Sequence, residues 1–375
     1  MGLLTGALPD FPWDTLEPYK ATARAHPDGI VDLSVGTPVD PTPAVVRRAL
    51  ADAADAPGYP TTYGSVELRE AVASWFARRR GVPDVDPAAV MATVGSKELV
   101  AWLPALLGLG AGDVVVHPEI AYPTYDVGAR LAGAQPLPAD DVAAWADRSD
   151  VRLVWLNSPS NPTGRVLGVD HLRAVVAAAR RIGAVVASDE CYALLPWEEP
   201  WASAGVPSVL DPRVSGGDHT DLLVVQSLSK QSNLAGYRAA FVAGDPALVA
   251  RLLEVRKHAG MMVPAPVQAA AAVALADDAH VAEQVARYGR RRRVLAAALA
   301  DAGLVVEESA AGLYLWARMP GAGQDCWQTV ADLASLGILV APGAFYGPAG
   351  TRHVRVALTA SDEDVARAAV RLSGA

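Results

Sequence analysis

The sequence predicts an α/β fold, with a large, mainly parallel β-sheet and a smaller α+β lobe. Continuous apolar runs of Val, Leu and Ala alternate with helix-like stretches from about residue 88 onward. Strands that are buried on both faces of a parallel sheet have such runs, whereas half-exposed strands alternate polar and apolar residues. The chain of 375 residues also exceeds what one small core needs, and its C-terminal part follows a different order of elements.

The large sheet is predicted from six apolar runs that helical stretches separate. Its strands are expected at residues 89–94, 113–118, 151–157, 184–189, 222–227 and 239–244. Helices are expected where apolar side chains recur at the period of an α-helix, at residues 95–110, 124–133 and 170–183. This alternation indicates a doubly wound core over residues 45–275.

The segment after residue 275 predicts the smaller lobe. A helix at about residues 280–302 precedes three strand-like runs, at 304–309, 312–319 and 353–359, with a further helix before the last run. We expect residues 276–375 to form an α+β domain together with an N-terminal arm, residues 1–44. The sequence has no internal repeats and no low-complexity linker, so the two lobes are expected to share a cleft.

The overall charge argues against nucleic acids and anionic membranes as general partners. Hydrophobic residues make up 51% of the chain and charged residues 19%, and the formal net charge is -9. The one basic run, "YGRRRRV" (288–294), lies in a stretch with helical apolar spacing. We expect an amphipathic helix there, with the arginines on its solvated face.

The sequence also argues against a metal site, a disulfide framework and a membrane anchor. Cys191 and Cys326 are far apart, and the seven histidines show no metal-ligand spacing. The N-terminal stretch "MGLLTGALPDFPWDTL" lacks a basic start and is interrupted by prolines, which does not fit a signal peptide. No apolar run reaches the length of a membrane span. A soluble, cytoplasmic protein is therefore expected.

Polar residues follow the predicted strands of the large sheet, where ligands bind in open α/β folds. A small-residue turn after the first strand begins a helix, whose N–H groups can hold a phosphate. Taken singly, each polar group has an ordinary explanation as a helix start, an Asn-Pro turn or a strand-end cap. The groups are Gly95, Ser96, Lys97, Asn157, Asn161, Asp189, Tyr192, Ser227, Lys230 and Arg238.

Lys230 directly follows an apolar strand, although an ammonium group is costly to desolvate. Its side chain therefore either reaches solvent or is held as a neutral amine. A neutral amine beside a carboxylate, a phenol, an amide, a guanidinium and a phosphate cradle fits pyridoxal phosphate closely. This cofactor needs a lysine for its aldehyde, an anion for its ring nitrogen and N–H donors for its phosphate.

The segments that carry this chemistry resemble those of the class I/II aminotransferases, the fold-type I group of pyridoxal-phosphate enzymes. The similar segments are "NSPSNPTG" (157–164), "SDECY" (188–192) and "SLSKQSNLAGYR" (227–238). The similarity extends over nearly the whole chain, through "VDLSVGTPVDPTP" (31–43), "YPTTYGSVELREAV" (59–72) and "HVRVALT" (353–359).

The resemblance implies a role for each residue near the cofactor ring. Lys230 would hold pyridoxal phosphate as an imine and then move the proton between the substrate Cα and the cofactor. Asp189 would pair with the protonated ring nitrogen. Tyr192 and Asn161 would hydrogen-bond the ring hydroxyl oxygen, and Tyr122 would stack on the ring face.

The resemblance also implies how the phosphate and the substrate are held. The phosphate would be bound by Gly95, Ser96, Lys97, Ser227 and Arg238, and by Tyr59 of a second subunit. The chain would therefore be a homodimer whose active sites lie at the interface. Arg355 would bind the substrate α-carboxylate, with Gly36 and Asn161 beside it. Two positions depart from the common pattern of the family, Lys97 and Tyr237.

The implied reaction is a ping-pong transfer of an amino group from an amino acid to 2-oxoglutarate. Within the family, the chain is most similar to actinobacterial-type N-succinyldiaminopimelate aminotransferases, through "FPWDTLEPYK" (11–20), "HPDGIVDLSVGTPVDP" (26–41) and "RKHAGMMVPAPVQAA" (256–270). Such a donor has a distal carboxylate and a succinyl amide. Arg165, Lys257 and His258 are candidates to bind these groups, and a surface or loop role for each stays open.

The same fold also supports different functions. The chain could be an aspartate, alanine or aromatic aminotransferase of broad specificity, or an enzyme like cystathionine β-lyase, because fold alone does not fix the reaction. A transcriptional regulator built on this fold needs an added basic DNA-binding domain. About forty residues precede the predicted core here, and they are not basic.

Overall fold

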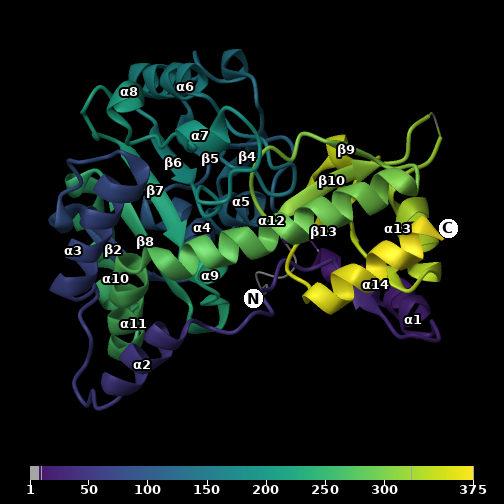
Figure 1. Cartoon of the computed structure of the whole chain (residues 1–375). Helices are drawn as coiled ribbons and strands as arrows, with labels where there is room; N and C mark the ends of the chain where they lie inside the picture. The colour runs from purple at the N-terminus through teal and green to yellow at the C-terminus, as the bar shows by residue number, and fades with distance from the viewer. Residues whose placement is uncertain (1–7, 10, 322, 375) are drawn as a thin grey trace, which may run out of the picture.

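The computed structural model describes residues 8–9, 11–321 and 323–374, which form two lobes, each built on one main β-sheet. In Figure 1 the large lobe carries β2 to β8, and the small lobe carries β9, β10 and β13. The expected N-terminal arm starts at residue 1, but residues 1–7 and 10 lie outside the described residues. They include the first part of the stretch "MGLLTGALPDFPWDTL", so the prediction made for that stretch falls in part outside the described residues.

The large lobe is built on a seven-stranded sheet in the order β2-β8-β7-β6-β5-β3-β4. Strand β8 runs antiparallel to both of its neighbours, and all other pairs are parallel. The predicted fold class is therefore confirmed. The strands are β2 (Val90–Val94), β3 (Val114–His117), β4 (Gln135–Pro138), β5 (Val151–Asn157), β6 (Val185–Asp189), β7 (Leu222–Ser227) and β8 (Ala239–Gly244).

Helices cover both faces of this sheet, which explains the uniformly apolar strands. Three of them pack on one face: α4 (Ser96–Leu106), α5 (Thr124–Ala132) and α10 (Pro246–Ala259). The other face is covered by α2 (Ala44–Asp52), α3 (Val66–Trp75), α6 (Val169–Ile182), α8 (Pro212–Ser215) and α11 (Ala265–Ala276). Two short helices, α7 (Trp201–Ala204) and α9 (Leu228–Gln231), lie in the connections.

The small lobe has its own core around an antiparallel sheet in the order β12-β13-β10-β9. The N-terminal segment joins this lobe, because β1 (Val31–Asp32) pairs with β11 (Ile338–Leu339) and Tyr19 stacks on Trp327. The remaining elements are α1 (Glu17–Arg24), β9 (Val305–Glu307), β10 (Tyr314–Arg318), α13 (Cys326–Ser335), β12 (Ala341–Pro342), β13 (Val354–Ala357) and α14 (Asp362–Ser373).

Helix α12 (Asp278–Asp301) runs from the large lobe to the small one (Figure 1). The arginines of this helix do not all lie on a solvated face, and that prediction is wrong for Arg291. The Arg291 side chain is 3% exposed and forms ion pairs with Asp40 at 2.7 Å and Asp362. These carboxylates compensate a charge that would otherwise be costly to bury. Arg290 and Arg293 are exposed, as expected.

The two cores support the predicted division into domains at residues 44/45 and 275/276, which stays a prediction. One core holds the residues of β2 to β8 and their helices, and the other holds the C-terminal elements together with α1 and β1. Across the described ranges, no helix combines the length and the apolar character that crossing a bilayer requires.

Candidate active site

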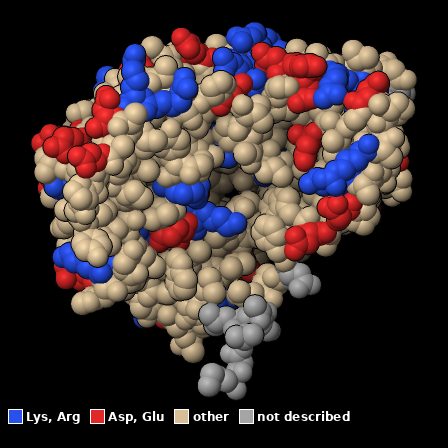
Figure 2. Space-filling view, turned by 90° about the horizontal axis from the view of Figure 1, so that it is seen from below, with Lys and Arg blue, Asp and Glu red and all other residues tan. Residues whose placement is uncertain are grey.

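A cleft of about 720 Å³ lies at the carboxyl ends of the parallel strands of the large sheet. Strands β5, β6 and β7 end there side by side, since Asn157 pairs in register with Asp189 and Asp189 with Val225. The small lobe closes the cleft with Tyr314 and Arg355. Figure 2 shows a hollow near the centre of one face of the molecule, with lysine and arginine atoms in it and around it.

Lys230 lies in α9, directly after β7, and its side chain points into the cleft. Burial lowers the pKa of its ammonium group, and Tyr314 opposes part of this shift. The Nζ atom donates a hydrogen bond to the carbonyl oxygen of Gly36. Lys230 therefore does not escape to solvent, and its environment favours the neutral amine.

Asp189 ends β6 and also faces the cleft. The Tyr125 hydroxyl donates to its Oδ2 at 3.0 Å, and the Cys191 backbone N–H donates to its Oδ1 at 3.2 Å. Burial raises the pKa of the Asp189 carboxyl. No lysine, arginine or histidine of the described residues forms an ion pair with it. The cleft thus holds a half-buried carboxylate whose protein partners are neutral.

Asn157, Asn161 and Arg355 form a chain of hydrogen bonds across the cleft. The Asn161 backbone N–H donates to Asn157 Oδ1 at 2.7 Å, and Arg355 donates from Nη1 to Asn161 Oδ1 at 3.0 Å. Arg355 also donates from Nη2 to the carbonyl of Ser34 at 2.6 Å. Its side chain is 2% exposed, and within the described residues its Nε has no hydrogen-bond partner. Arg355 is therefore a buried residue of β13 and not an exposed charge on the protein surface.

Two tyrosines stand beside this arginine. The Tyr192 and Tyr314 hydroxyls lie 3.3 Å apart, and the Arg355 guanidinium lies 4.1 Å from the centre of the Tyr314 ring. Burial, followed by the neighbouring Tyr314, raises the pKa of Tyr192 well above its ordinary value. A side chain at Gly36 would overlap the Tyr314 hydroxyl. Position 36 therefore has to be small for Tyr314 to reach Tyr192.

Gly95 and Arg238 meet at the other end of the cleft. Gly95 has φ +77°, and any side chain there would overlap the Arg238 guanidinium. The Gly95 N–H donates to the Arg238 carbonyl at 2.9 Å. Ser96 begins α4, whose N-terminus is open to the cleft, and Ser227 lines the same wall. Free N–H groups and a guanidinium at one point can bind an anion.

The Lys97 ammonium extends from this helix start toward the opposite wall. Its Nζ donates to the Tyr122 hydroxyl at 3.3 Å and lies 5.3 Å from the centre of the Tyr122 ring. It also lies 5.7 Å from the Phe11 ring. Trp13 packs against Tyr122 at a ring distance of 5.7 Å. The backbone of Lys97 therefore belongs to the helix N-terminus, while its charge lies in an aromatic part of the cleft.

Several predicted residues do not line the cleft. Tyr59 is 96% exposed on the loop between α2 and α3. Arg165 lies 3.8 Å from Asp140 and lines a separate cavity of about 90 Å³ beside β5. Lys257 pairs with Glu254 at 2.6 Å on the surface, and His258 is exposed. The described part of the chain therefore brings none of the three expected side-chain binders into the cleft.

The structure adds residues that the sequence did not reveal. Tyr125, Tyr314, Phe11 and Trp13 line the cleft. Tyr125 lies only three residues after Tyr122 in "AYPTY", and this proximity was its one signal in the sequence. Cys191 and Cys326 are both buried and free. No group of three or more His, Cys, Asp or Glu side chains among the described residues could hold a metal ion.

Comparisons with known proteins agree with this geometry. A family model described as "Aminotransferase class I and II" matches residues 28–372. A probable aminotransferase of Mycobacterium tuberculosis is 60% identical over 372 residues, which cover 99% of this chain and 87% of that protein. The 4-dedimethylamino-4-oxo-anhydrotetracycline transaminase OxyQ of Streptomyces rimosus is 59% identical, with 98% of this chain and 99% of that protein covered.

A solved structure resembles the whole chain. It is described as a probable N-succinyldiaminopimelate aminotransferase from Thermus thermophilus, and it superposes with a TM-score of 0.86 at 30% sequence identity. The match covers 97% of this chain and all of that one. Both the sequence relatives and this neighbour span the two lobes and the cleft between them.

Proposed function

The chain belongs to the class I and II aminotransferase family, and we propose that it is a cytoplasmic, pyridoxal-phosphate-dependent enzyme acting on N-succinyl-LL-2,6-diaminopimelate. In this proposal the amino group passes to 2-oxoglutarate. The observation that carries the proposal is the position of the Lys97 ammonium group, which lies in the cleft beside Tyr122. Lys230, Arg238 and Arg355 are the other cations that line the cleft, and each has a role toward the cofactor or the substrate α-carboxylate.

The residues of the cleft fit pyridoxal phosphate. Asp189 is a half-buried carboxylate with neutral protein partners, so a protonated ring nitrogen would supply the missing cation. The Gly95–Arg238 contact leaves N–H groups and a guanidinium for the phosphate. Tyr122 would lie against the ring, Asn161 and Tyr192 would hydrogen-bond its hydroxyl oxygen, and Ser96 and Ser227 would complete the phosphate site.

Bound in this way, the cofactor supplies an aldehyde that takes up the amino group and a ring that accepts electrons. The chain provides the remaining groups. Burial lowers the pKa of Lys230, which favours the neutral amine that can take a proton from the substrate Cα. Asp189, held by the Tyr125 hydroxyl, keeps a negative charge at the far end of the ring. Tyr314 and Arg355 of the small lobe form a wall of the cleft around these groups.

The substrate would lie between Arg355 and Lys97. The Arg355 guanidinium, stacked over Tyr314, is oriented to bind the α-carboxylate through two N–H groups. Lys97 would bind the distal carboxylate, and the phenol of Tyr122 holds its ammonium group in place. The Thermus neighbour, a probable N-succinyldiaminopimelate aminotransferase, supports a donor of this class.

A second candidate substrate is favoured by one comparison. OxyQ, 59% identical, is named for the transamination of 4-dedimethylamino-4-oxo-anhydrotetracycline. Phe11, Trp13 and Tyr122 provide aromatic surface that could pack against a polycyclic ketone. An aspartate, alanine or aromatic donor, and a β-lyase reaction, compete with both substrates as functions of this fold.

Initial rates with each candidate decide between these functions. The purified enzyme should transaminate N-succinyl-LL-2,6-diaminopimelate with a higher kcat/KM than aspartate, alanine or phenylalanine. Amination of the tetracycline ketone at a higher kcat/KM would select the second candidate instead. Release of pyruvate from cystathionine would indicate the β-lyase reaction.

The enzyme is further proposed to be a homodimer in which Tyr59 completes the phosphate site of the other subunit. Tyr59 is 96% exposed in the single chain, which is unusual for a large aromatic side chain and fits a contact with a partner. Hybrid dimers test this role. Mixing Lys230→Ala and Tyr59→Phe subunits creates some sites that lack both residues and others that carry both, so activity should partly return after mixing.

A further inference from the structure

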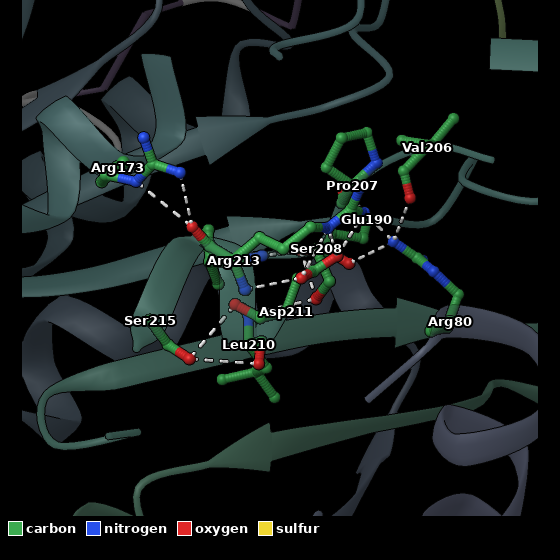
Figure 3. Close-up of polar contacts among 11 residues, drawn as sticks. Arg80, Arg173, Glu190, Val206, Pro207, Ser208, Leu210, Asp211, Arg213 and Ser215 are labelled. Carbon is green, nitrogen blue, oxygen red and sulfur yellow. Dashed lines mark hydrogen bonds and ion pairs between the residues drawn. The ribbon is translucent and has the colours of Figure 1, made fainter. Parts of the chain in front are cut away.

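A buried ion pair lies directly behind Asp189. Glu190 is the next residue, and because consecutive side chains of an extended segment point to opposite sides, it points away from the cleft. The Arg80 Nη2 donates to Glu190 Oε2 at 2.8 Å, and both side chains are 1% exposed (Figure 3). The Glu190 backbone N–H donates to the Val225 carbonyl at 2.9 Å. The pair is thus anchored to the peptide that carries Asp189.

Further hydrogen bonds tie this pair to one loop. Glu190 Oε1 accepts from the Ser208 hydroxyl at 3.1 Å and from the Val209 N–H at 3.0 Å. Arg80 Nη2 also donates to the carbonyls of Val206 and Pro207, each at 3.3 Å. Figure 3 shows Ser208 beside Glu190, and the Val206 carbonyl at the Arg80 guanidinium. The carboxylate therefore has fixed donors on both oxygens.

The local backbone turns Arg80 inward. Residues Phe76–Arg80 form a π-helical turn that continues α3 and ends at Gly81. In an uninterrupted α-helix, the spacing from Val72 and Trp75 would bring Arg79 to the inner face. The wider turn places Arg80 there instead, and Arg79 lies 3.5 Å from Asp278, nearer the surface. Such turns are rare and are frequent at functional sites.

Stability alone does not explain why the chain buries these charges. The desolvation of an ion pair offsets most of its attraction, and apolar residues of similar shape often serve as well. Removing one partner is costly, however, because the other charge stays buried without compensation. The pair is therefore suited to hold one geometry rather than to add stability.

We propose that Arg80 and Glu190 are positioning residues that fix the peptide of Asp189, so that its carboxylate faces the cofactor ring. This inference rests on the proposed function, since Asp189 acts through pyridoxal phosphate. The hydrogen bonds of the Glu190 side chain fix this peptide to the loop at residues 206–209, on the side opposite the cleft. The Arg80 guanidinium compensates the negative charge of Glu190. Glu190 therefore does not act on Asp189 as a second, uncompensated negative charge.

The test measures the affinity for pyridoxal phosphate and the steady-state constants of three variants, Arg80→Met, Glu190→Gln and the double variant. Each single change should weaken cofactor binding and lower kcat by about tenfold, while the KM for the amino donor changes little. The double variant, which has no buried charge, should lose less than the product of the two single losses. The pH midpoint of the bound cofactor's visible absorption band should shift in both single variants.

Arg213→Met is the matched control. Arg213 pairs with Asp211 at 2.6 Å in the same region (Figure 3), but its side chain is 63% exposed and is not connected to Asp189. This variant should bind the cofactor like the wild type. Should Arg80→Met fail to fold, Glu190→Gln alone gives the same comparison.

Single variants that match Arg213→Met in cofactor affinity, kcat and pH midpoint would overturn the inference. Losses that simply multiply in the double variant would overturn the claim that the two residues act as a pair. A wild-type protein that takes up no pyridoxal phosphate would overturn the proposed function first, and this inference with it. The first two outcomes leave the proposed function intact.

Discussion

The Tyr125 hydroxyl lies 3.0 Å from the Asp189 carboxylate and donates a hydrogen bond to it. Tyr125 is 2% exposed in α5, and Asp189 ends β6, so the contact joins a helix to the end of a central strand. Burial raises the pKa of Asp189, and the hydrogen bond from Tyr125 opposes that shift. The Tyr125 hydroxyl therefore favours the charged form of the half-buried Asp189 carboxylate.

We expect Tyr125→Phe to weaken catalysis without removing the site. The phenyl ring keeps its packing on Trp155, but Asp189 loses a donor that favours its charged form. The kcat should fall by about tenfold, as for the loss of a hydrogen bond to a charged group. The acidic limb of the pH profile of kcat should also move to higher pH. An unchanged profile would mean that Tyr125 does not act on Asp189.

Asp189 should also make the stability of the cofactor-free protein depend on pH. Since burial raises the pKa of Asp189 in the folded state above that in the unfolded chain, its contribution to stability is present at low pH. This contribution is lost as the pH rises through the folded-state pKa. Asp189→Asn lacks this loss, so its stability relative to the wild type should grow as the pH rises above about 4, the ordinary pKa of an aspartate. Urea unfolding at several pH values measures the difference, and a constant difference would contradict the prediction.

Lys97→Met should separate substrates by their distal charge. The variant keeps an apolar side chain between Phe11 and Tyr122 but loses the ammonium group. The KM for N-succinyl-LL-2,6-diaminopimelate should rise by about tenfold or more, as expected for the loss of a charge-assisted hydrogen bond. The KM for alanine, which has no distal carboxylate, should change little.

A surface lysine provides the control for that experiment. Lys257 pairs with Glu254 and does not line the cleft, so Lys257→Met should leave both KM values unchanged. Equal effects of Lys97→Met on both donors would assign Lys97 to the cofactor phosphate instead. A loss of cofactor affinity in this variant would support the same reassignment.

Arg291→Met should destabilise the small lobe and the N-terminal arm that packs with it. Arg291 pairs through both terminal nitrogens with Asp40, in the segment that follows Gly36, and also contacts Asp362 of α14. Asp40 would keep Arg287 at 3.4 Å and Gln284 at 2.8 Å. It would lose its two hydrogen bonds from Arg291, which should lower the free energy of unfolding by about 2 kcal/mol. Arg290→Met, on the exposed side of the same helix, should change it by less than about 0.5 kcal/mol. Equal effects of the two variants would contradict a structural role for the buried pair.

The sequence predicted the strand-end groups because parallel strands bring their carboxyl ends to one edge of a sheet. Lys230, Asp189 and Asn161 could be placed together on that basis, since each follows a recognisable apolar run. The sequence could not predict β4 (Gln135–Pro138) as a strand, because it holds two prolines and lies at the edge of the sheet.

The remaining errors concern side chains whose partners come from distant segments. Arg291 lies in a run of four arginines, and only contacts with residues 40 and 362 distinguish it from its neighbours. Arg80 is the last residue of a run of three arginines, and its burial depends on the π-helical turn at Phe76–Arg80. Tyr314 is an aromatic residue in an apolar strand, and its role follows from Gly36 and Arg355, which are far from it in the sequence.

The decisive experiment asks which lysine carries the cofactor. The chain has four lysines, Lys20, Lys97, Lys230 and Lys257, so the other three serve as internal controls. The protein is loaded with pyridoxal phosphate, reduced with borohydride, digested and mapped by mass spectrometry. We expect the adduct on the peptide that contains Lys230 and none in Lys230→Ala. An adduct on another lysine of the wild type, or no adduct at all, would contradict the role proposed for Lys230.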